Sequence, residues 1–453
     1  MFLLYGLTDT HIFGQQAAFR YRSVSHQGCL PWRCCVCGPL PFITVWNAPT
    51  EPCMSKYKVD LDLSVFDIVL NQNQSFMGQN ITIFYESKLG LYPHYGARGE
   101  AVNGGVPQNF SLREHLSRAQ ADIVMDIPSP DFQGLAVVDW ESWRPLWIRN
   151  WDSKRMYWDG SRALVLAKHP DWAPALVDEE AQKEFEAAGR AFMEGTLRLG
   201  RSLRPGGLWG FYGFPGCYNY QYKNATANYT GECPELEVKR NDELAWLWNA
   251  SSALYPDVYL ELGLRSRGDA IRRYTHHRIL EALRVAGQVP ITPPVLPYSR
   301  IAYTYTLEFL SQEDLVHTIG ESVALGAAGV VLWGDGSFSK SQATCQAVKE
   351  YIDETLGRYV VNVTTAATIC SKVVCSGQGR CQRRDPASAA LLHLDPRGWR
   401  VLATPGLRGA PQYSVRGQLS QRSARDMASQ FQCQCYPGWS GEHCHKPLQS
   451  RPQ

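Results

Sequence analysis

The sequence lacks three features, each of which would point to a class of function. It has no run of about 18 apolar residues, the length that a membrane-spanning helix needs. Its net charge of +2 is close to neutral, so nothing in the composition favours nucleic acid as a partner. No Gly-x-Gly-x-x-Gly turn supports a dinucleotide fold. We therefore expect a globular protein with no transmembrane segment, and nothing in the chain implies a metal or organic cofactor.

A secretory signal is also not recognisable. Residues 1–5 form an apolar run that is too short for one, and residues 6–38 are irregular. We expect the segment 1–38 to be disordered and the true signal to be missing or replaced. The tail 447–453 lacks the hydrophobic stretch of a lipid-anchor signal.

Cysteines and glycosylation sequons, in contrast, are abundant. The chain has 14 cysteines and seven Asn-x-Ser/Thr sequons, a combination typical of proteins made in an oxidising compartment. We expect a secreted or lysosomal glycoprotein with several sequons occupied, among them Asn109, Asn228 and Asn362. The role of four N-terminal cysteines stays open, with metal binding as one alternative: Cys29, Cys34, Cys35 and Cys37.

From residue 39 to about 360, short apolar strands alternate with amphipathic helical stretches. The expected strands are 42–46, 81–85, 135–139, 208–214, 258–262, 295–301 and 329–333. The expected helices are 178–203, 240–254, 269–286, 312–325 and 343–356. Alternation of this kind implies a parallel sheet, and seven or eight units favour an α/β fold, a distorted (β/α) TIM-like barrel. An open doubly wound sheet is the rival.

Two acids stand at the end of one of these strands. Leu135–Val138 is the strand, and Asp139 and Glu141 follow it between tryptophans. Alternate residues of an extended chain share one face, so the two carboxylates would lie about 6–7 Å apart. One of them then tends to keep its proton, as glycoside cleavage requires. The alternative is a strand end with two solvated acids.

Aromatic residues fall at the ends of other expected strands. Tyr212, Tyr259 and Trp333 occupy such places, and in a barrel the working residues sit at the carboxyl ends of the strands. Each of these rings alone could belong to the core, but together with the acids they predict one site.

The chain after residue 360 is expected to be loop-rich. Its last six cysteines have the spacing of an EGF-like module over 361–446, split by an insertion at 382–432. A disulfide-stapled cap without a partner is the alternative to a binding role for this module.

Four longer motifs carry a family resemblance over roughly residues 40–446. They are Asp-Trp-Glu-x-Trp-Arg-Pro at 139–145, Leu-Trp-Gly-Phe-Tyr-Gly-Phe-Pro at 208–215, Asn-Asp-x-Leu-Ala-Trp-Leu-Trp at 241–248 and Gly-Ala-Ala-Gly-Val-Val-Leu-Trp at 326–333. The sequence in these motifs resembles the animal hyaluronidases. The resemblance implies a retaining glycoside hydrolase that cuts the β-1,4 linkage between N-acetylglucosamine and glucuronate in hyaluronan.

The resemblance also implies roles for individual residues. Glu141 matches the general acid, and Asp139 matches the carboxylate that stays charged and orients the substrate's N-acetyl group, whose carbonyl oxygen is the nucleophile. Tyr212 and Tyr259 match hydroxyl donors to that group, and Trp333 matches a ring that lines its pocket. Tyr85 and Arg144 are similar to residues of the binding groove.

The same resemblance implies five disulfides: Cys53–Cys345, Cys217–Cys233, Cys370–Cys381, Cys375–Cys433 and Cys435–Cys444. It also exposes a departure, because some active relatives carry an acid where this chain has Thr304. Nearby Asp335 either compensates for that loss or is a turn residue.

Hyaluronan is a polyanion, so basic side chains should line its groove; the candidates are Arg144, Arg149, Lys154, Arg155 and Arg300. We expect a monomer. Two alternatives stay open: a hydrolase that prefers chondroitin, and a glycoprotein that binds either polymer with weak or no turnover. An intact acid pair favours the enzyme over the binder.

Overall fold

The computed structural model describes residues 40–69, 76–224, 228–406 and 411–448. The expected disorder of residues 1–38, the four N-terminal cysteines and the sequon at Asn73 lie outside the described residues. No helix within the described ranges is long and apolar enough to cross a membrane.

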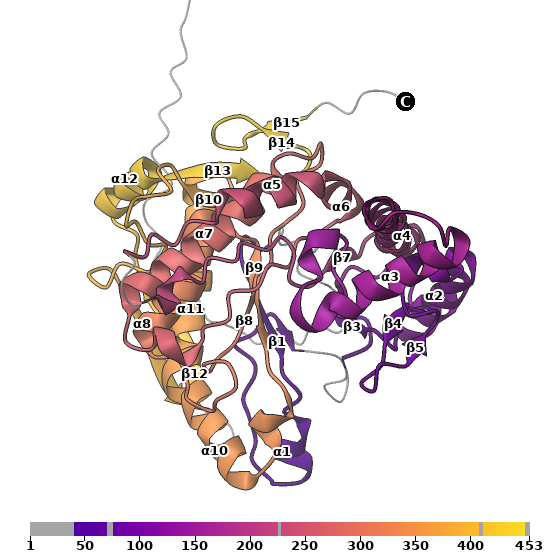
Figure 1. Ribbon diagram of the computed structural model, residues 1–453. Coiled ribbons are helices and arrows are strands. Elements are labelled where there is room, and N and C mark those ends of the chain that lie inside the picture. Colours follow the sequence, from indigo (N-terminus) through magenta and orange to yellow (C-terminus); the bar gives the residue numbers. More distant parts are fainter. Residues whose placement is uncertain (1–39, 70–75, 225–227, 407–410, 449–453) are drawn as a thin grey trace, which may run out of the picture.

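Parallel strands in two sheets make the fold a distorted (β/α) barrel (Figure 1). The described residues show no strand pairing between β2 and β3. One sheet has the order β2-β1-β9-β8 and the other the order β3-β6-β7, with every neighbouring pair parallel. Three isolated bridges close the gap between β7 and β8, at Tyr212–Tyr255, Leu254–Val295 and Asp257–Tyr298. The strand bounds are β1 Ile43–Asn47, β2 Ile68–Val69, β3 Ile81–Tyr85, β6 Leu135–Asp139, β7 Leu208–Phe211, β8 Tyr298–Ser299 and β9 Gly329–Trp333.

The strands are apolar on both faces because each face meets a different part of the core. In β6, Leu135 and Val137 belong to the cluster inside the barrel, whereas Ala136 and Val138 pack with the surrounding helices. Strands covered on both faces read as continuous apolar runs, which explains why β3, β6 and β9 are found where the sequence predicts them.

Helices cover the outside of the barrel. In Figure 1, α2, α3 and α4 gather beside β3 and β7, while α7, α8 and α11 lie on the opposite side. The helix bounds are α1 Glu51–Ser55, α2 Leu112–Asp126, α3 Arg155–Lys168, α4 Pro174–Leu203, α5 Glu235–Glu243, α6 Ala245–Ala250, α7 Gly268–Ala286, α8 Gln312–Leu315, α9 Glu321–Leu325, α10 Gln342–Tyr351 and α11 Gly357–Val374. Two π-helical segments, Val316–Gly320 and Ile352–Leu356, join α8 to α9 and α10 to α11.

Several expected elements differ from the structure, and the strand expected at 295–301 is shortened to β8. The pairing predicted at 258–262 begins earlier: Leu254 and Val258 donate backbone hydrogen bonds to Pro294 and Tyr298, and residues 262–264 form a 3-10 turn. Pro256 has no N–H to donate, so this part of the barrel is reduced to isolated bridges. The expected single helix at 240–254 is instead two helices, α5 and α6, which share Leu244 as a cap.

The boundary expected at residue 360 falls inside α11, so the loop-rich region begins only at Cys375. Two antiparallel pairs and one helix follow: β10 Gly379–Arg383 with β13 Phe431–Cys435, β11 Trp399–Pro405 with β12 Pro411–Gly417, and α12 Gln421–Gln430. Two short pairs complete the sheets, β4 His94–Tyr95 with β5 Ala101–Val102 and β14 Trp439–Ser440 with β15 Lys446–Pro447.

Five disulfides join the described cysteines, in the same pairs that the resemblance implies. Cys53–Cys345 ties α1 to α10, and the two helices lie together at the bottom of Figure 1. Cys370 lies in α11, and its bond to Cys381 in β10 attaches the C-terminal region to a helix of the barrel.

Candidate active site

The carboxyl ends of the barrel strands surround a pocket of about 310 Å³, which we call the acid pocket. Asp139 ends β6, Trp333 ends β9, and Tyr212 directly follows β7. The lining residues are Ile83, Val137, Asp139, Glu141, Tyr212, Tyr259, Tyr298, Arg300, Thr304, Tyr305, Trp333 and Asp335. Tyr85, at the end of β3, is paired in register with Asp139. The fold thus brings together the acids and aromatic residues that the sequence predicts at strand ends.

The two acids have different environments. Asp139 is half-buried, and its Oδ1 atom is buried without a hydrogen-bond partner. Burial, followed by the negative charge of Glu141, raises the pKa of Asp139 to about 7. Glu141 is exposed, and its carboxylate lies 3.3 Å from the guanidinium of Arg144. Without a bound ligand, desolvation therefore favours the protonated form of Asp139 below pH 7. The expected charge on Asp139 in the substrate complex stays a prediction.

The loop that carries Glu141 is held by charged side chains from outside the acid pair. Glu86, directly after β3, accepts hydrogen bonds from the backbone N–H groups of Glu141 and Ser142, at 3.2 and 2.8 Å. Lys154 donates to the carbonyl oxygens of the same two residues, and Arg144 donates to the carbonyl of Trp140 at 3.2 Å. Because these contacts bind backbone, they fix the segment from which the side chain of Glu141 extends.

Aromatic packing anchors the same loop to the barrel. Trp140 is buried, and its ring stacks on that of Tyr92 with centroids 4.6 Å apart. Tyr92 also stacks on Trp143, whose indole N–H donates to the carbonyl of Pro93 at 2.8 Å. The tryptophans that flank the acids in the sequence therefore belong to the support of the loop, and neither lines the pocket.

Three aromatic side chains form one wall of the acid pocket. The ring of Tyr259 lies 6.2 Å from those of Tyr212 and Trp333, centroid to centroid. Burial raises the pKa values of Tyr212 and Tyr259 well above the ordinary value of 10.0. Both phenols therefore remain protonated at physiological pH and can donate a hydrogen bond to a ligand oxygen.

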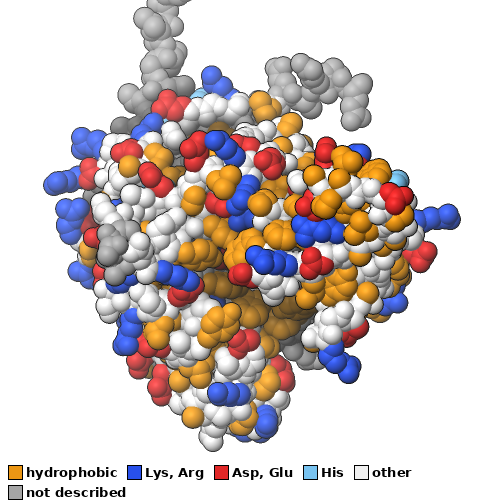
Figure 2. Space-filling model, in the orientation of Figure 1, with side chains coloured by type: hydrophobic (Ala, Val, Ile, Leu, Met, Phe, Trp, Pro, Cys, Tyr) orange, Lys and Arg blue, Asp and Glu red, His pale blue; other side chains and the backbone are white. Residues whose placement is uncertain are grey.

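A second pocket of about 230 Å³, the arginine pocket, adjoins the first. Glu141 and Tyr212 line both pockets, so they stand at the border between them. The basic residues of the arginine pocket are Arg144, Arg149, Arg240 and Arg278. Lys154 and Arg155, expected in the groove, line neither pocket. Figure 2 shows that one face of the molecule is hollowed near its centre, with hydrophobic side chains in the hollow and charged ones around it.

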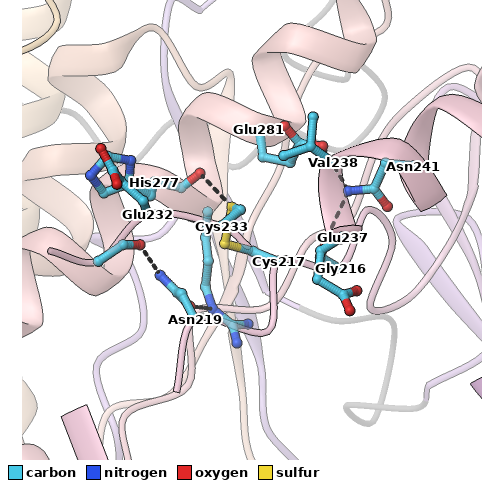
Figure 3. The surroundings of a disulfide bond; sticks show 12 residues. Gly216, Cys217, Asn219, Glu232, Cys233, Glu237, Val238, Asn241, His277 and Glu281 are labelled. Carbon is cyan, nitrogen blue, oxygen red and sulfur yellow. Dashed lines mark hydrogen bonds between the residues drawn. A yellow bond between two sulfur atoms is a disulfide. The ribbon is translucent and has the colours of Figure 1, made fainter. Parts of the chain in front are cut away.

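A disulfide forms part of the wall of the arginine pocket. Cys217, which lines this pocket, is bonded to Cys233, and Figure 3 shows the surrounding side chains. The amide of Asn241 donates to the carbonyl of Gly216 at 2.8 Å and to the carboxylate of Glu281 at 2.7 Å. Asn219 donates to the carbonyl of Gly231 at 2.7 Å, so the two sides of the disulfide loop are also joined by hydrogen bonds.

Sequence reasoning missed several residues of the two pockets. Glu86 follows the predicted Tyr85, but nothing in the sequence shows that it binds a loop 55 residues away. Asp257 and Arg278 line the arginine pocket and form an ion pair at 2.8 Å. Thr304 lines the acid pocket, and its hydroxyl donates to the carbonyl of Leu260 at 3.0 Å. No group of three or more His, Cys, Asp or Glu side chains among the described residues could hold a metal ion.

Comparison with known proteins places the chain in one family. The hyaluronidase family pattern matches residues 33–448. Human Hyaluronidase-1 is 51% identical over 416 residues, which are 90% of this chain and 94% of the human protein. A hyaluronidase of Crotalus adamanteus is 46% identical, over 90% of both chains. The crystal structure of bee venom hyaluronidase in complex with a hyaluronic acid tetramer superposes with a TM-score of 0.63 at 33% identity, covering 70% of this chain and 98% of the bee chain. The chain belongs to the hyaluronidase family.

Proposed function

We propose that this protein hydrolyses the β-1,4 bonds between N-acetylglucosamine and glucuronate in hyaluronan, with retention of configuration. The observation that carries the proposal is Asp139 Oδ1, a buried carboxylate oxygen without a hydrogen-bond partner beside an aromatic wall. A buried acceptor without a partner costs free energy, so the site is suited to a ligand that supplies a donor. The N–H of an acetamido group on the sugar is such a donor.

In this scheme Asp139 positions the nucleophile, which belongs to the substrate. Its carboxylate accepts the acetamido N–H, so that the acetamido carbonyl oxygen attacks the anomeric carbon as the glycosidic bond breaks. The product of this step is a cyclic oxazolinium ion, whose positive charge the ionised carboxylate stabilises. Tyr212 and Tyr259 donate hydrogen bonds to the acetamido group, and Trp333 packs against its methyl group. Tyr85 and Arg144 contribute to the groove.

Glu141 supplies the proton that the leaving group needs. As the glycosidic bond breaks, the carboxyl group of Glu141 protonates the departing oxygen. Its place at the border of the two pockets suits a bond that spans them. The resulting carboxylate then takes a proton from water, which opens the oxazolinium ring and restores the acetamido group. Two inversions at one carbon leave the configuration retained.

Other features of the chain support proposals on its destination, its C-terminal module, its glycosylation and its oligomeric state. Five disulfides support secretion or a lysosomal destination. The cysteine pairing supports an EGF-like module interrupted by residues 382–432. Asn109 and Asn228 are exposed and suited to glycosylation, whereas Asn362 is half-buried and accepts a hydrogen bond from Leu394. We propose a monomer, since one chain supplies both pockets.

A turnover assay with Glu141→Gln tests the function. Wild type should depolymerise hyaluronan, and the variant should lose turnover by at least about 100-fold while it still binds the polymer. Glu114→Gln, an exposed change in the first turn of α2, is the control and should behave as wild type. If wild type and Glu141→Gln are equally inert but both bind hyaluronan, the protein is a binder. Chondroitin in the same assay tests polymer preference.

A further inference from the structure

Among the described residues that line the acid pocket, Arg300 is the one with a permanent positive charge. It directly follows β8, so it stands at the carboxyl end of a barrel strand, like the acids and the aromatic residues. Its side chain is only 5% exposed. A guanidinium buried to this extent needs compensating contacts, and those contacts indicate its role.

Two kinds of contact hold Arg300 in place. Its Nη2 atom lies 3.1 Å from a carboxylate oxygen of Asp335, whose side chain is 45% exposed. Its guanidinium carbon lies 5.0 Å from the centre of the Trp333 ring and 5.7 Å from that of Phe338. The guanidinium is thus held between an acid and aromatic rings, and its position does not depend on a ligand.

A buried N–H group of Arg300 is left without an acceptor. The Nε atom is buried and has no hydrogen-bond partner. Asp139 Oδ1, in the lining of the same pocket, is a buried acceptor without a donor. The residues that line the pocket therefore include one buried donor and one buried acceptor without partners. A ligand that carries both an amide N–H and an anionic oxygen would satisfy both atoms.

We infer that Arg300 binds the carboxylate of the uronate on the non-reducing side of the N-acetylglucosamine. This inference rests on the proposed function, because the acetamido group must occupy the acid pocket. Glu141 borders both pockets, and the bond it protonates lies on the reducing side of that sugar. Arg300 lines the acid pocket but not the arginine pocket, so we place the sugar on the non-reducing side at Arg300. A charged hydrogen bond from Nε then selects uronate at that position.

A purely structural role is the competing explanation. Arg300 could serve only to hold Trp333 through the cation–π contact, and its loss would then impair the acid pocket for every substrate. The two roles differ in one respect. A carboxylate contact matters only when the substrate has a carboxylate, whereas a tilted Trp333 impairs cleavage of any related polymer.

The experiment compares two polymers and four proteins. The polymers are hyaluronan and hyaluronan whose carboxyl groups have been chemically reduced to primary alcohols. The proteins are wild type, Arg300→Met, Arg300→Lys and Arg204→Met. Arg204 is the matched control, since it is also 5% exposed, lines neither pocket and donates to the carbonyl of Ile127. The readouts are kcat/KM on each polymer and the unfolding midpoint.

We expect Arg300→Met to lose about 10- to 100-fold in kcat/KM on hyaluronan, the range for a hydrogen bond to a charged group. On the reduced polymer its loss should be below about threefold, and Arg300→Lys should recover part of the loss on hyaluronan. Arg204→Met should change the unfolding midpoint without distinguishing the polymers. An equal loss on both polymers, or none on hyaluronan, would overturn the inference. A wild type that cuts neither polymer would instead refute the proposed function.

Discussion

The carboxylate of Glu86 accepts hydrogen bonds from both the backbone N–H and the hydroxyl of Ser142, at 2.8 and 2.5 Å. A third bond comes from the N–H of Glu141. The end of β3 thus holds the loop that follows β6, and Glu86 fixes the backbone of the residue that we propose as the general acid. Glu86 also adds negative charge near Asp139 and contributes to its raised pKa.

Removing the acceptor at Glu86 should reduce turnover more than binding. In Glu86→Ala the N–H groups of Glu141 and Ser142 lose their common partner, so the catalytic loop can move. We expect kcat to fall about 10- to 100-fold, with a smaller change in KM. Glu86→Gln keeps an acceptor oxygen and should recover most of kcat. A Ser142→Ala background provides a double-mutant cycle, and strict additivity of the two changes would argue against a shared contact.

The sequence predicts the acid pocket well because its members lie at the ends of apolar runs. Asp139 and Trp333 are the last residues of β-strands that are buried on both faces, and such runs stand out in the sequence. Glu86 could not be predicted, since its partners are backbone groups of another loop. The spacing predicts that one acid of the pair keeps its proton but not that Asp139 has the raised pKa, because burial is the main cause and sequence spacing does not reveal it.

Two other features could not be predicted from the sequence: the isolated bridges near Pro256 and the helix that crosses the boundary expected near residue 360. A proline inside a buried strand removes a hydrogen-bond donor, and the resulting isolated bridges have no periodic signal. The helix α11 continues past residue 360 because its apolar face packs under the C-terminal region. The loop-rich region therefore begins after the helix ends at Val374, fourteen residues beyond the expected boundary.

Substrate binding should release a proton from Asp139. In the empty site burial raises its pKa from the ordinary 3.8 to about 7, so the group is protonated at pH 5. The bound acetamido N–H needs the ionised form, which lowers the pKa in the complex. Affinity should then rise with pH, by up to about tenfold per unit, and level off near pH 7. Titration calorimetry with a thio-linked hyaluronan tetrasaccharide, in buffers of different ionisation enthalpy, measures both the affinity and the proton.

Asp139→Asn is the control for this linkage. The variant has no carboxyl group at position 139, so its affinity should be nearly independent of pH and its binding should release no proton. Proton uptake by wild type, or an affinity that falls as pH rises from 5 to 7, would mean that Asp139 stays protonated in the complex. The proposed role of the carboxylate as an acceptor would then be wrong.

Tyr305 should contribute to polymer affinity although its backbone conformation is strained. Its side chain is 98% exposed at the rim of the acid pocket, and its φ of 61° lies in the left-handed region. Tyr305→Gly should raise KM about 3- to 10-fold, through loss of a ring that can stack on a sugar. The unfolding midpoint should stay the same or rise, since glycine adopts this φ freely. Tyr305→Phe keeps the ring and should keep KM; if KM rises equally there, the hydroxyl is the important group.

The ion pair between Glu321 in α9 and Arg383 in β10 should hold the C-terminal region to the barrel. Both side chains are fully buried, and two hydrogen bonds of 2.6 and 2.7 Å join them, with His276 of α7 adding a third contact at 2.7 Å. Burial alone would raise the pKa of Glu321, but the hydrogen bonds from His276 and Arg383 outweigh it and lower the pKa. The carboxylate is therefore ionised in the folded protein.

Arg383→Met should cost about 3–5 kcal/mol of unfolding free energy, because it leaves the carboxylate of Glu321 buried without its main partner. Since the folded-state pKa of Glu321 is lowered, the stability from the pair is present above the ordinary pKa of 4.5 and is lost as pH falls below it. Denaturant unfolding at pH 7 and pH 4 measures both effects. Arg198→Met, which breaks an exposed pair with Glu194, should cost below about 1 kcal/mol at either pH. The double variant Glu321→Met/Arg383→Met should be more stable than Arg383→Met, since it buries no unpaired charge; a larger loss in the double variant would contradict the assignment.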